Sequence, residues 1–126
     1  MQCLTDIQMQ ASKRVLRYLK GTIDHGLQLT RTTFSSLQGF YDSDWAGDIS
    51  DRKSTGAYII YFESNPISWS CKKQPIIVKS FVEAEYRTIA STTTEILWLQ
   101  ELLKELNHPL SNKPLVHSDN LGATYL

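Results

Sequence analysis

The sequence has 126 residues, of which 41% are hydrophobic and 21% are charged. This length fits one domain with at most a short appendage, and the composition excludes a disordered chain. Thirteen basic residues balance thirteen acidic ones. However, residues 1–36 hold five basic and two acidic residues, whereas the remainder holds eight and eleven. The net charge of zero is therefore the sum of a basic N-terminal segment and an acidic remainder.

Membrane insertion, secretion and cysteine chemistry are not indicated. No stretch approaches the roughly 18 apolar residues of a spanning helix, and the N-terminus lacks the basic-then-apolar pattern of a secretory signal. We therefore expect an intracellular, cytoplasmic protein with no membrane partner. The two cysteines, Cys3 and Cys71, stand alone, which excludes a zinc knuckle and a disulfide framework.

The first predicted element is a helix from about Asp6 to Lys20. Thr5 and Gln8 have the spacing of a capping box, Gly21 supplies a C-terminal stop, and apolar residues recur at helical steps. The helix also carries a cationic stripe, which consists of Lys13, Arg14, Arg17 and Lys20. This stripe either contacts nucleic-acid phosphates or is a solvated face, and the sequence leaves both open.

The middle of the chain is typical of strands. Ile23–Leu29 is a candidate short strand, and the polar run Thr30–Ser36 is expected to link it to the domain proper, which starts near Leu37. Within the domain, β-branched and aromatic residues predict three strands and one turn. The strands are expected at Leu37–Asp42, Ala57–Phe62 and Ile67–Ser70, with the turn at Asn65-Pro66.

A long helix and a last strand complete the expected fold. Phe81–Asn107 has apolar residues at helical spacing on one face, together with Glu85. Leu115–Asp119 is typical of a short strand, and Asn120 is a plausible cap for a further helix. Strands followed by helix, strand and helix predict an α/β fold with a mixed β-sheet and flanking helices.

Three carboxylates stand out by their positions. Asp42 closes the first predicted strand, Asp119 closes the last, and Glu85 lies in the opening turns of the long helix on its apolar face. Open α/β sheets bind ligands at strand ends, so the three could share one site. Clustered carboxylates repel unless a divalent cation compensates, and oxygen-only ligands favour magnesium or manganese. The pattern predicts metal-dependent phosphodiester hydrolysis.

Each carboxylate also has a plainer explanation. An aspartate at a strand end is often a turn residue or a helix cap, and Glu85 could form an ion pair with a neighbouring element. Three further aspartates are expected in a solvated loop, the first of them close enough to Asp42 to reach a metal's outer ligand sphere. They are Asp44, Asp48 and Asp51.

Aromatic and basic side chains add weaker signals. All three tryptophans could stack on bases, but for two of them, Trp69 and Trp98, packing in the core is expected; the third is Trp45. Lys72 and Lys73 follow a predicted strand and either contact phosphate or keep a sheet edge soluble.

Long motifs in the sequence match a known family. They are FYDSDWAGDISDRKSTGAYI, ISWSCKKQP, VEAEYRTIASTTTEILWLQELLKEL and HSDN. Together they resemble the ribonuclease H domain of copia-type retrotransposon polyproteins. The preceding KRVLRYLKGTIDHGL is similar to the segment that joins the reverse transcriptase to that domain. The resemblance therefore implies a connecting helix and linker at residues 1–36 and a ribonuclease H-like domain at residues 37–126.

The resemblance implies an enzyme that hydrolyses the RNA strand of RNA–DNA hybrids endonucleolytically. It implies two magnesium ions, or manganese in their place, held by Asp42, Glu85 and Asp119 as catalytic and metal-binding residues. Nucleic acid would be contacted by the cationic stripe of the first helix and by Lys72 and Lys73. The implied partners are an RNA–DNA hybrid and the reverse transcriptase region of the same polyprotein, in the cytoplasm or within virus-like particles.

The chain also departs from the family pattern. The family usually has STEAEY where residues 81–86 are FVEAEY, and a cysteine commonly precedes the final aspartate where Ser118 stands. The pattern also continues past SDN to a fourth acidic residue and a closing helix, so the resemblance predicts a C-terminally truncated domain. Two other functions stay open: an inactive remnant that binds nucleic acid or a partner protein, and a glycosidase that uses Asp42 and Glu85.

Overall fold

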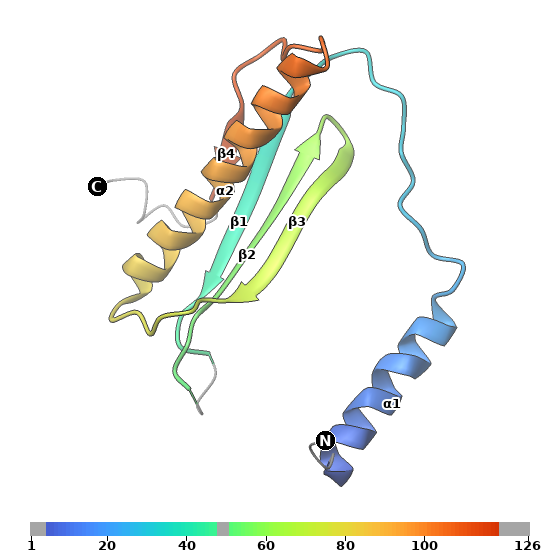
Figure 1. Ribbon diagram of the computed structural model, residues 1–126, viewed down its shortest axis with the longest axis vertical. Helices are drawn as coiled ribbons and strands as arrows, with labels where there is room; N and C mark the ends of the chain where they lie inside the picture. Colours follow the sequence, from blue (N-terminus) through green and yellow to red (C-terminus); the bar gives the residue numbers. More distant parts are fainter. Residues whose placement is uncertain (1–4, 48–50, 119–126) are drawn as a thin grey trace.

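The protein has the α/β architecture that the sequence predicts. The computed structural model describes residues 5–47 and 51–118. Its elements are α1 (Asp6–Gly21), β1 (Leu37–Asp44), β2 (Thr55–Phe62), β3 (Asn65–Lys73), α2 (Phe81–Glu105) and β4 (Leu115–His117). The strands form one mixed sheet in the order β3-β2-β1-β4, with α2 beside it and α1 apart from it (Figure 1). This arrangement is consistent with a ribonuclease H-like fold. Among the described residues, no helix is long and apolar enough to cross a membrane.

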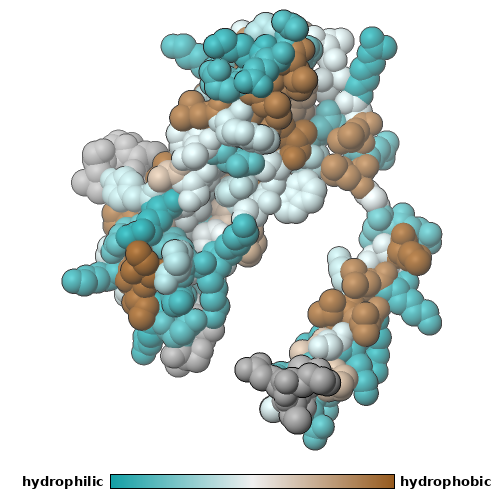
Figure 2. Space-filling model, in the orientation of Figure 1, coloured by the Kyte–Doolittle hydropathy of each residue, from teal (hydrophilic) through white to brown (hydrophobic). Residues whose placement is uncertain are grey.

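Helix α1 begins and is capped as predicted. The side chain of Thr5 accepts a hydrogen bond from the backbone N–H of Gln8, and the side chain of Gln8 accepts one from the N–H of Thr5 at 2.9 Å. None of its residues is buried, so its apolar side chains lie on the molecular surface (Figure 2). Most helical stability in proteins comes from packing of an apolar face, and α1 has no such packing against the other described elements.

The segment after α1 differs from the prediction. Ile23–Leu29 forms no strand and pairs with none of the four described strands. The chain is instead tied to the sheet at Thr30, whose backbone N–H and C=O both bond to the side-chain amide of Asn65 at 2.7 and 2.9 Å. The hairpin turn lies at residues 63–64, two residues before the predicted Asn65-Pro66, with Glu63 at φ 55° and Asn65 already the first residue of β3.

Strand β1 is the centre of the sheet. It pairs antiparallel with β2, which pairs antiparallel with β3, and it pairs parallel with β4. β1 runs two residues past its predicted end, so Asp42 lies within the strand and Asp44 closes it. The parallel pairing with β4 brings the carboxyl ends of β1 and β4 to the same edge of the sheet.

The core lies between α2 and the α2-facing side of β1 and β2. It is built on Leu37, Ile60, Ile96 and Leu99. Two strand positions hold glycine because α2 lies too close for a side chain. A Cβ at Gly39 would come within 2.7 Å of Ile96 Cδ1, and one at Gly56 within 2.6 Å of Thr88 Oγ1.

The other face of the sheet is not covered by any described element. The predictions that Trp69 and Trp98 belong to the core are wrong, since the exposed fractions of these side chains are 62% and 58%. Trp69 lies on the edge strand β3, and Trp98 lies on the outer side of α2. Hydrophobic character alone does not reveal which face of an element is covered.

Candidate active site

The start of α2 lies over the carboxyl end of β1. Gly39 of β1 opposes Thr92 and Ile96, whereas Gly56 of β2, the register partner of Ser43, opposes Thr88. The C-terminal end of β1 therefore lies near the N-terminal start of α2. The next sheet-facing position of α2 in that direction is Glu85, which thus lies near the end of β1.

Glu85 is a buried acid, as its place on an apolar face predicted. Its exposed fraction is 4%, and it belongs to the buried side of α2 with Ala84, Thr88 and Thr92. A buried carboxylate is costly unless polar groups or a cation compensate for the lost water. Ser43 Oγ, on the strand beneath, is also buried, and no hydrogen bond from the described residues reaches it.

Asp42 lies near the same end of the sheet, two residues before the end of β1, and its side chain is exposed. Tyr41 and Ser43 are buried toward α2, and successive side chains alternate along a strand. Asp42 therefore belongs to the alternate side of β1 with Phe40. Asp42 and Glu85 share one end of the sheet but not one cluster. Within residues 5–47 and 51–118, no group of three His, Cys, Asp or Glu residues is arranged to hold a metal ion.

Asp119, the third predicted carboxylate, lies outside the described residues. The strand that precedes it is in place. His117 of β4 is the register partner of Phe40, and the two rings stack with centroids 4.7 Å apart. In the sequence, Asp42 and Asp119 each follow these paired residues by two positions. The roles of Asp42, Glu85 and Asp119 stay predictions.

The other aspartates divide into different environments. Asp44 was expected in a loop but is the last residue of β1, and its carboxylate lies against Gly47, where a Cβ would collide with it. Asp51 accepts hydrogen bonds from the backbone N–H of Lys53 at 3.0 Å and from Lys73 Nζ at 3.2 Å. Asp48 lies outside the described residues. Asp44 therefore adds a second β1 carboxylate, besides Asp42, at this end of the sheet.

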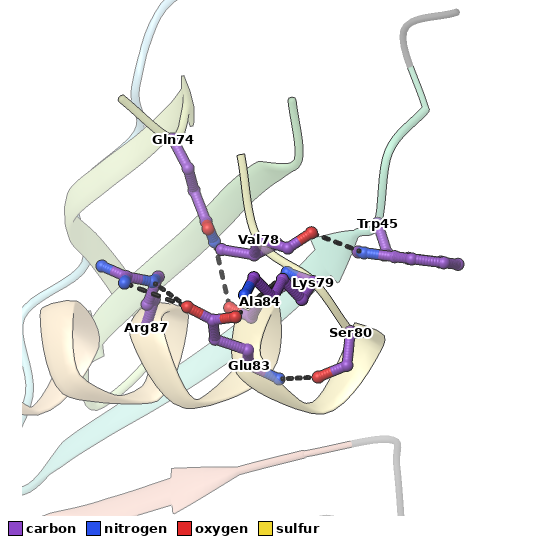
Figure 3. Close-up of polar contacts among 8 residues, drawn as sticks. All are labelled: Trp45, Gln74, Val78, Lys79, Ser80, Glu83, Ala84 and Arg87. Atoms are coloured by element: carbon purple, nitrogen blue, oxygen red, sulfur yellow. Dashed lines mark hydrogen bonds and ion pairs between the residues drawn. The ribbon is translucent and has the colours of Figure 1, made fainter. Parts of the chain in front are cut away.

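A hydrogen-bonded frame joins the loop after β1 to α2, and the sequence carried no signal of it. Ser54 is fully buried; its Oγ accepts a hydrogen bond from Ala46 N at 3.2 Å, and its carbonyl accepts one from Gln74 N at 2.8 Å. The side chain of Gln74 then donates to the carbonyl of Ala84 at 3.0 Å (Figure 3). Ala84 precedes Glu85, so this frame, defined by Ala46, Ser54, Gln74 and Ala84, holds the buried acid relative to the loop.

The two glutamates of α2's first turns have different surroundings. Glu83 accepts a hydrogen bond from the backbone N–H of Lys79 at 3.0 Å and one from Arg87 at 3.1 Å (Figure 3). The Lys79 N–H, and then the Arg87 guanidinium, lower the pKa of Glu83 below its ordinary value of 4.5. Ser80 caps the helix by accepting from Glu83 N. Glu83 is thus engaged in shaping the helix start, whereas Glu85 faces the sheet.

The predicted nucleic-acid contacts fall on two surfaces. Lys13, Arg14, Arg17 and Lys20 are all exposed on α1. Lys72 and Lys73 end β3 and line a groove of about 590 Å³ between β3 and α2, to which Arg87 also contributes. Lys73 forms an ion pair with Asp51 at 3.2 Å, so its positive charge is partly compensated within the protein. Nucleic-acid binding by either surface stays a prediction.

The chain is similar to transposon proteins. It is 52% identical over 122 residues to the retrovirus-related Pol polyprotein from transposon RE2 of Arabidopsis thaliana, and 49% identical over 122 residues to that from transposon RE1. Each alignment covers 97% of this chain and 8% of the polyprotein. An uncharacterized mitochondrial protein of the same plant is 49% identical over 86 residues, which are 68% of this chain and 36% of that protein. No protein-family model and no solved structure matches the chain.

Proposed function

The chain is homologous to a segment of retrovirus-related Pol polyproteins of transposons, and from this premise we propose that it performs the ribonuclease H step. In this proposal it hydrolyses the RNA strand of an RNA–DNA hybrid endonucleolytically and depends on a divalent cation. Residues 1–36 connect it to the reverse transcriptase region of the polyprotein, which is its proposed protein partner. The chain spans only 8% of the length of these relatives, so their other activities are not assigned to it.

The observation that carries the proposal is the buried Glu85. An acid with an exposed fraction of 4% lies on the sheet side of α2, at the end of the sheet where β1 presents Asp42. A strand end bearing carboxylates on an α/β sheet is a common place for ligand binding. The motifs around Asp42, Glu85 and Asp119 resemble those of copia-type ribonuclease H, and the proposal assigns all three as catalytic.

The donor atoms at this end of the sheet are of the type that a hard divalent cation prefers, although no three acidic, His or Cys side chains among the described residues form a cluster there. Asp42, Asp44 and Glu85 offer carboxylate oxygens, the ligands that magnesium and manganese prefer. Asp42, Glu85 and Asp119 would hold two Mg²⁺ ions, or Mn²⁺. When bound, these ions would supply Lewis-acid stabilisation of the phosphate charge that builds up during hydrolysis.

The chain's own residues then have distinct tasks. Glu85 presents a negative charge from within the protein, where water does not screen it, so its attraction for a cation is strong. Asp42 is exposed and faces the solvent side, from which the nucleic acid arrives. The frame of Ala46, Ser54, Gln74 and Ala84 keeps the loop after β1 and the start of α2 at a constant separation. Preorganised charges of this kind need no rearrangement when the substrate binds.

Matched glutamine variants of the two α2 glutamates test the proposal. Glu85→Gln keeps the side-chain shape but removes the charge, so we expect magnesium-dependent hybrid cleavage to fall by about 100-fold or more. Glu83→Gln, two residues away and on the other side of the helix, should keep activity near that of the wild type. Far-UV circular dichroism and thermal melting confirm that both variants fold. Full activity of Glu85→Gln, or cleavage that survives a chelator, would refute the assignment.

A second function is favoured by the exposure of α1. The cationic stripe of Lys13, Arg14, Arg17 and Lys20 lies on a helix that buries none of its residues, and such a helix is available for a partner. The chain could therefore bind nucleic acid or a partner protein without cleaving anything. If the protein binds a hybrid but does not cleave it at any magnesium or manganese concentration, the result would support this function over hydrolysis.

A further inference from the structure

Trp45 is an exposed aromatic residue directly beside the candidate site. It follows Asp44 at the end of β1 and lies three positions after Asp42 in the chain. Its exposed fraction is 45%. The uncovered part of its ring therefore belongs to the same end of the sheet as the carboxylates.

The ring is held in place although much of it is exposed. The indole Nε1–H donates a hydrogen bond to the carbonyl of Val78 at 3.3 Å (Figure 3), and Val78 itself is buried, with an exposed fraction of 3%. The next residue, Ala46, is bonded to the fully buried Ser54. Trp45 is thus fixed at its side chain and through its neighbour's backbone.

The same hydrogen bonds relate Trp45 to Glu85. Ala46 connects through Ser54 and Gln74 to the carbonyl of Ala84, the residue before Glu85. A ligand held by the carboxylates would therefore meet the indole at a set position. The other tryptophans lack this arrangement, because Trp69 lies on edge strand β3 and Trp98 lies on the outer side of α2, beyond its midpoint.

We propose that Trp45 is a nucleic-acid contact residue that packs its indole against a nucleotide of the strand held at the carboxylate end of the sheet. This inference rests on the proposed function and adds a specific substrate contact to it. A fixed ring loses little conformational freedom on binding, and a flat apolar surface gains from leaving water. Aromatic rings pack on nucleotides with little dependence on base sequence. Hybrids with an A-like shape present a wide, shallow minor groove that such a ring can reach.

Fluorescence can report this contact directly. In the variant Trp69→Phe/Trp98→Phe, Trp45 is the one remaining tryptophan, so all indole emission comes from it. We expect a short RNA–DNA hybrid, added with calcium in place of magnesium to limit cleavage, to quench this emission and shift it to shorter wavelength. Heparin, a polyanion without bases, should leave it unchanged. An unchanged Trp45 emission while the hybrid binds would overturn the inference.

Affinity measurements give an independent test. Trp45→Ala should weaken hybrid binding about tenfold, and Trp45→Phe, which keeps an aromatic ring, should weaken it less. Trp69→Ala and Trp98→Ala are matched controls and should bind like the wild type. Circular dichroism excludes misfolding, and Trp45→Phe keeps the test valid if Trp45→Ala unfolds. Wild-type affinity in a folded Trp45→Ala or Trp45→Phe variant would overturn the inference.

Cleavage by the same protein preparations, assayed separately with magnesium, distinguishes this inference from the proposed function. Intact cleavage together with an unresponsive Trp45 overturns the contact and leaves the hydrolytic function in place. A responsive Trp45 without cleavage supports the contact and overturns hydrolysis. Absence of any hybrid binding by the wild type overturns both.

Discussion

Replacing Gly39 by alanine tests the packing of α2 on β1. The new Cβ would lie 2.7 Å from Ile96 Cδ1 and 3.2 Å from Thr92 Cγ2, both too close for normal contact. Overpacking of this kind costs about 1–3 kcal/mol of unfolding free energy. For a chain of this size, 1 kcal/mol corresponds to about 4 °C in Tm, so Gly39→Ala should melt about 4–12 °C below the wild type.

The variant Ile96→Val supplies the matched rescue, because it removes the Cδ1 atom that the new methyl group meets. On its own it should cost about 0.5–1.5 kcal/mol. The double variant Gly39→Ala/Ile96→Val should then cost about 1 kcal/mol less than the sum of the two single variants. Urea and thermal denaturation measure all three, with Gly26→Ala as the control, since nothing lies within 4 Å of a Cβ at Gly26.

Additive costs in this cycle would refute the reasoning. They would mean that Ile96 does not lie over Gly39, and hence that the register of α2 on the sheet is different. The position of Glu85 at the carboxyl end of β1 follows from that register. The cycle is therefore a stability measurement that bears directly on the candidate active site.

Three further predictions concern charge and capping. Changing Lys13, Arg17 and Lys20 to glutamine should weaken hybrid binding and lower the log–log salt slope by about 0.9 for each lost phosphate contact, whereas an unchanged slope would make the stripe a solvated face. Because the pKa of Glu83 is lowered, its contribution to stability is complete above pH 4.5 and is lost as pH falls through the folded-state pKa. The Tm difference between wild type and Glu83→Gln should therefore be constant above pH 4.5 and shrink below it, as melting at several pH values would reveal. Ser80→Ala should cost about 1 kcal/mol in chemical denaturation through loss of the N-cap, and an unchanged midpoint would contradict the capping role.

Local features of the fold could be predicted from the sequence. The capping box of Thr5 and Gln8 depends on residues three positions apart, and it is confirmed. Helix α2 begins at Phe81 as its periodicity predicts and ends two residues before the predicted Asn107. Its buried acid was visible as one polar residue on an apolar face. The cap and the helix bounds depend on contacts within one element, and the side of α2 that is buried follows from its helical periodicity.

Features that depend on distant contacts could not be predicted. The exposure of Trp69 follows from which face of the sheet α2 covers, and a strand pattern does not contain that information. The hydrogen bonds that Ser54 accepts from the N–H groups of Ala46 and Gln74 join residues of three different segments. The candidate carboxylates could be predicted because they stand at recognisable sequence positions, whereas the hydrogen bond from Trp45 to Val78 joins residues 33 positions apart and leaves no local sequence pattern.

The two hydrogen bonds between the Asn65 side chain and the Thr30 backbone limit the distance that α1 can move from the sheet. Residues 22–29 are the tether between the end of α1 and this anchor, and at about 3.6 Å per residue they extend at most about 29 Å. The helix is thus confined to a small volume around the hairpin, which gives its cationic stripe a millimolar effective concentration toward anything bound on the sheet. Asn65→Ala combined with Ser64→Ala, which removes the remaining hydrogen bond between Thr30 Oγ1 and Ser64 Oγ at 2.9 Å, would lengthen the tether to residues 22–34, because the next anchored residue is Ser35, whose carbonyl accepts a hydrogen bond from Ser111 N. Effective concentration falls roughly as the −3/2 power of length, so the local concentration of α1 would drop about twofold.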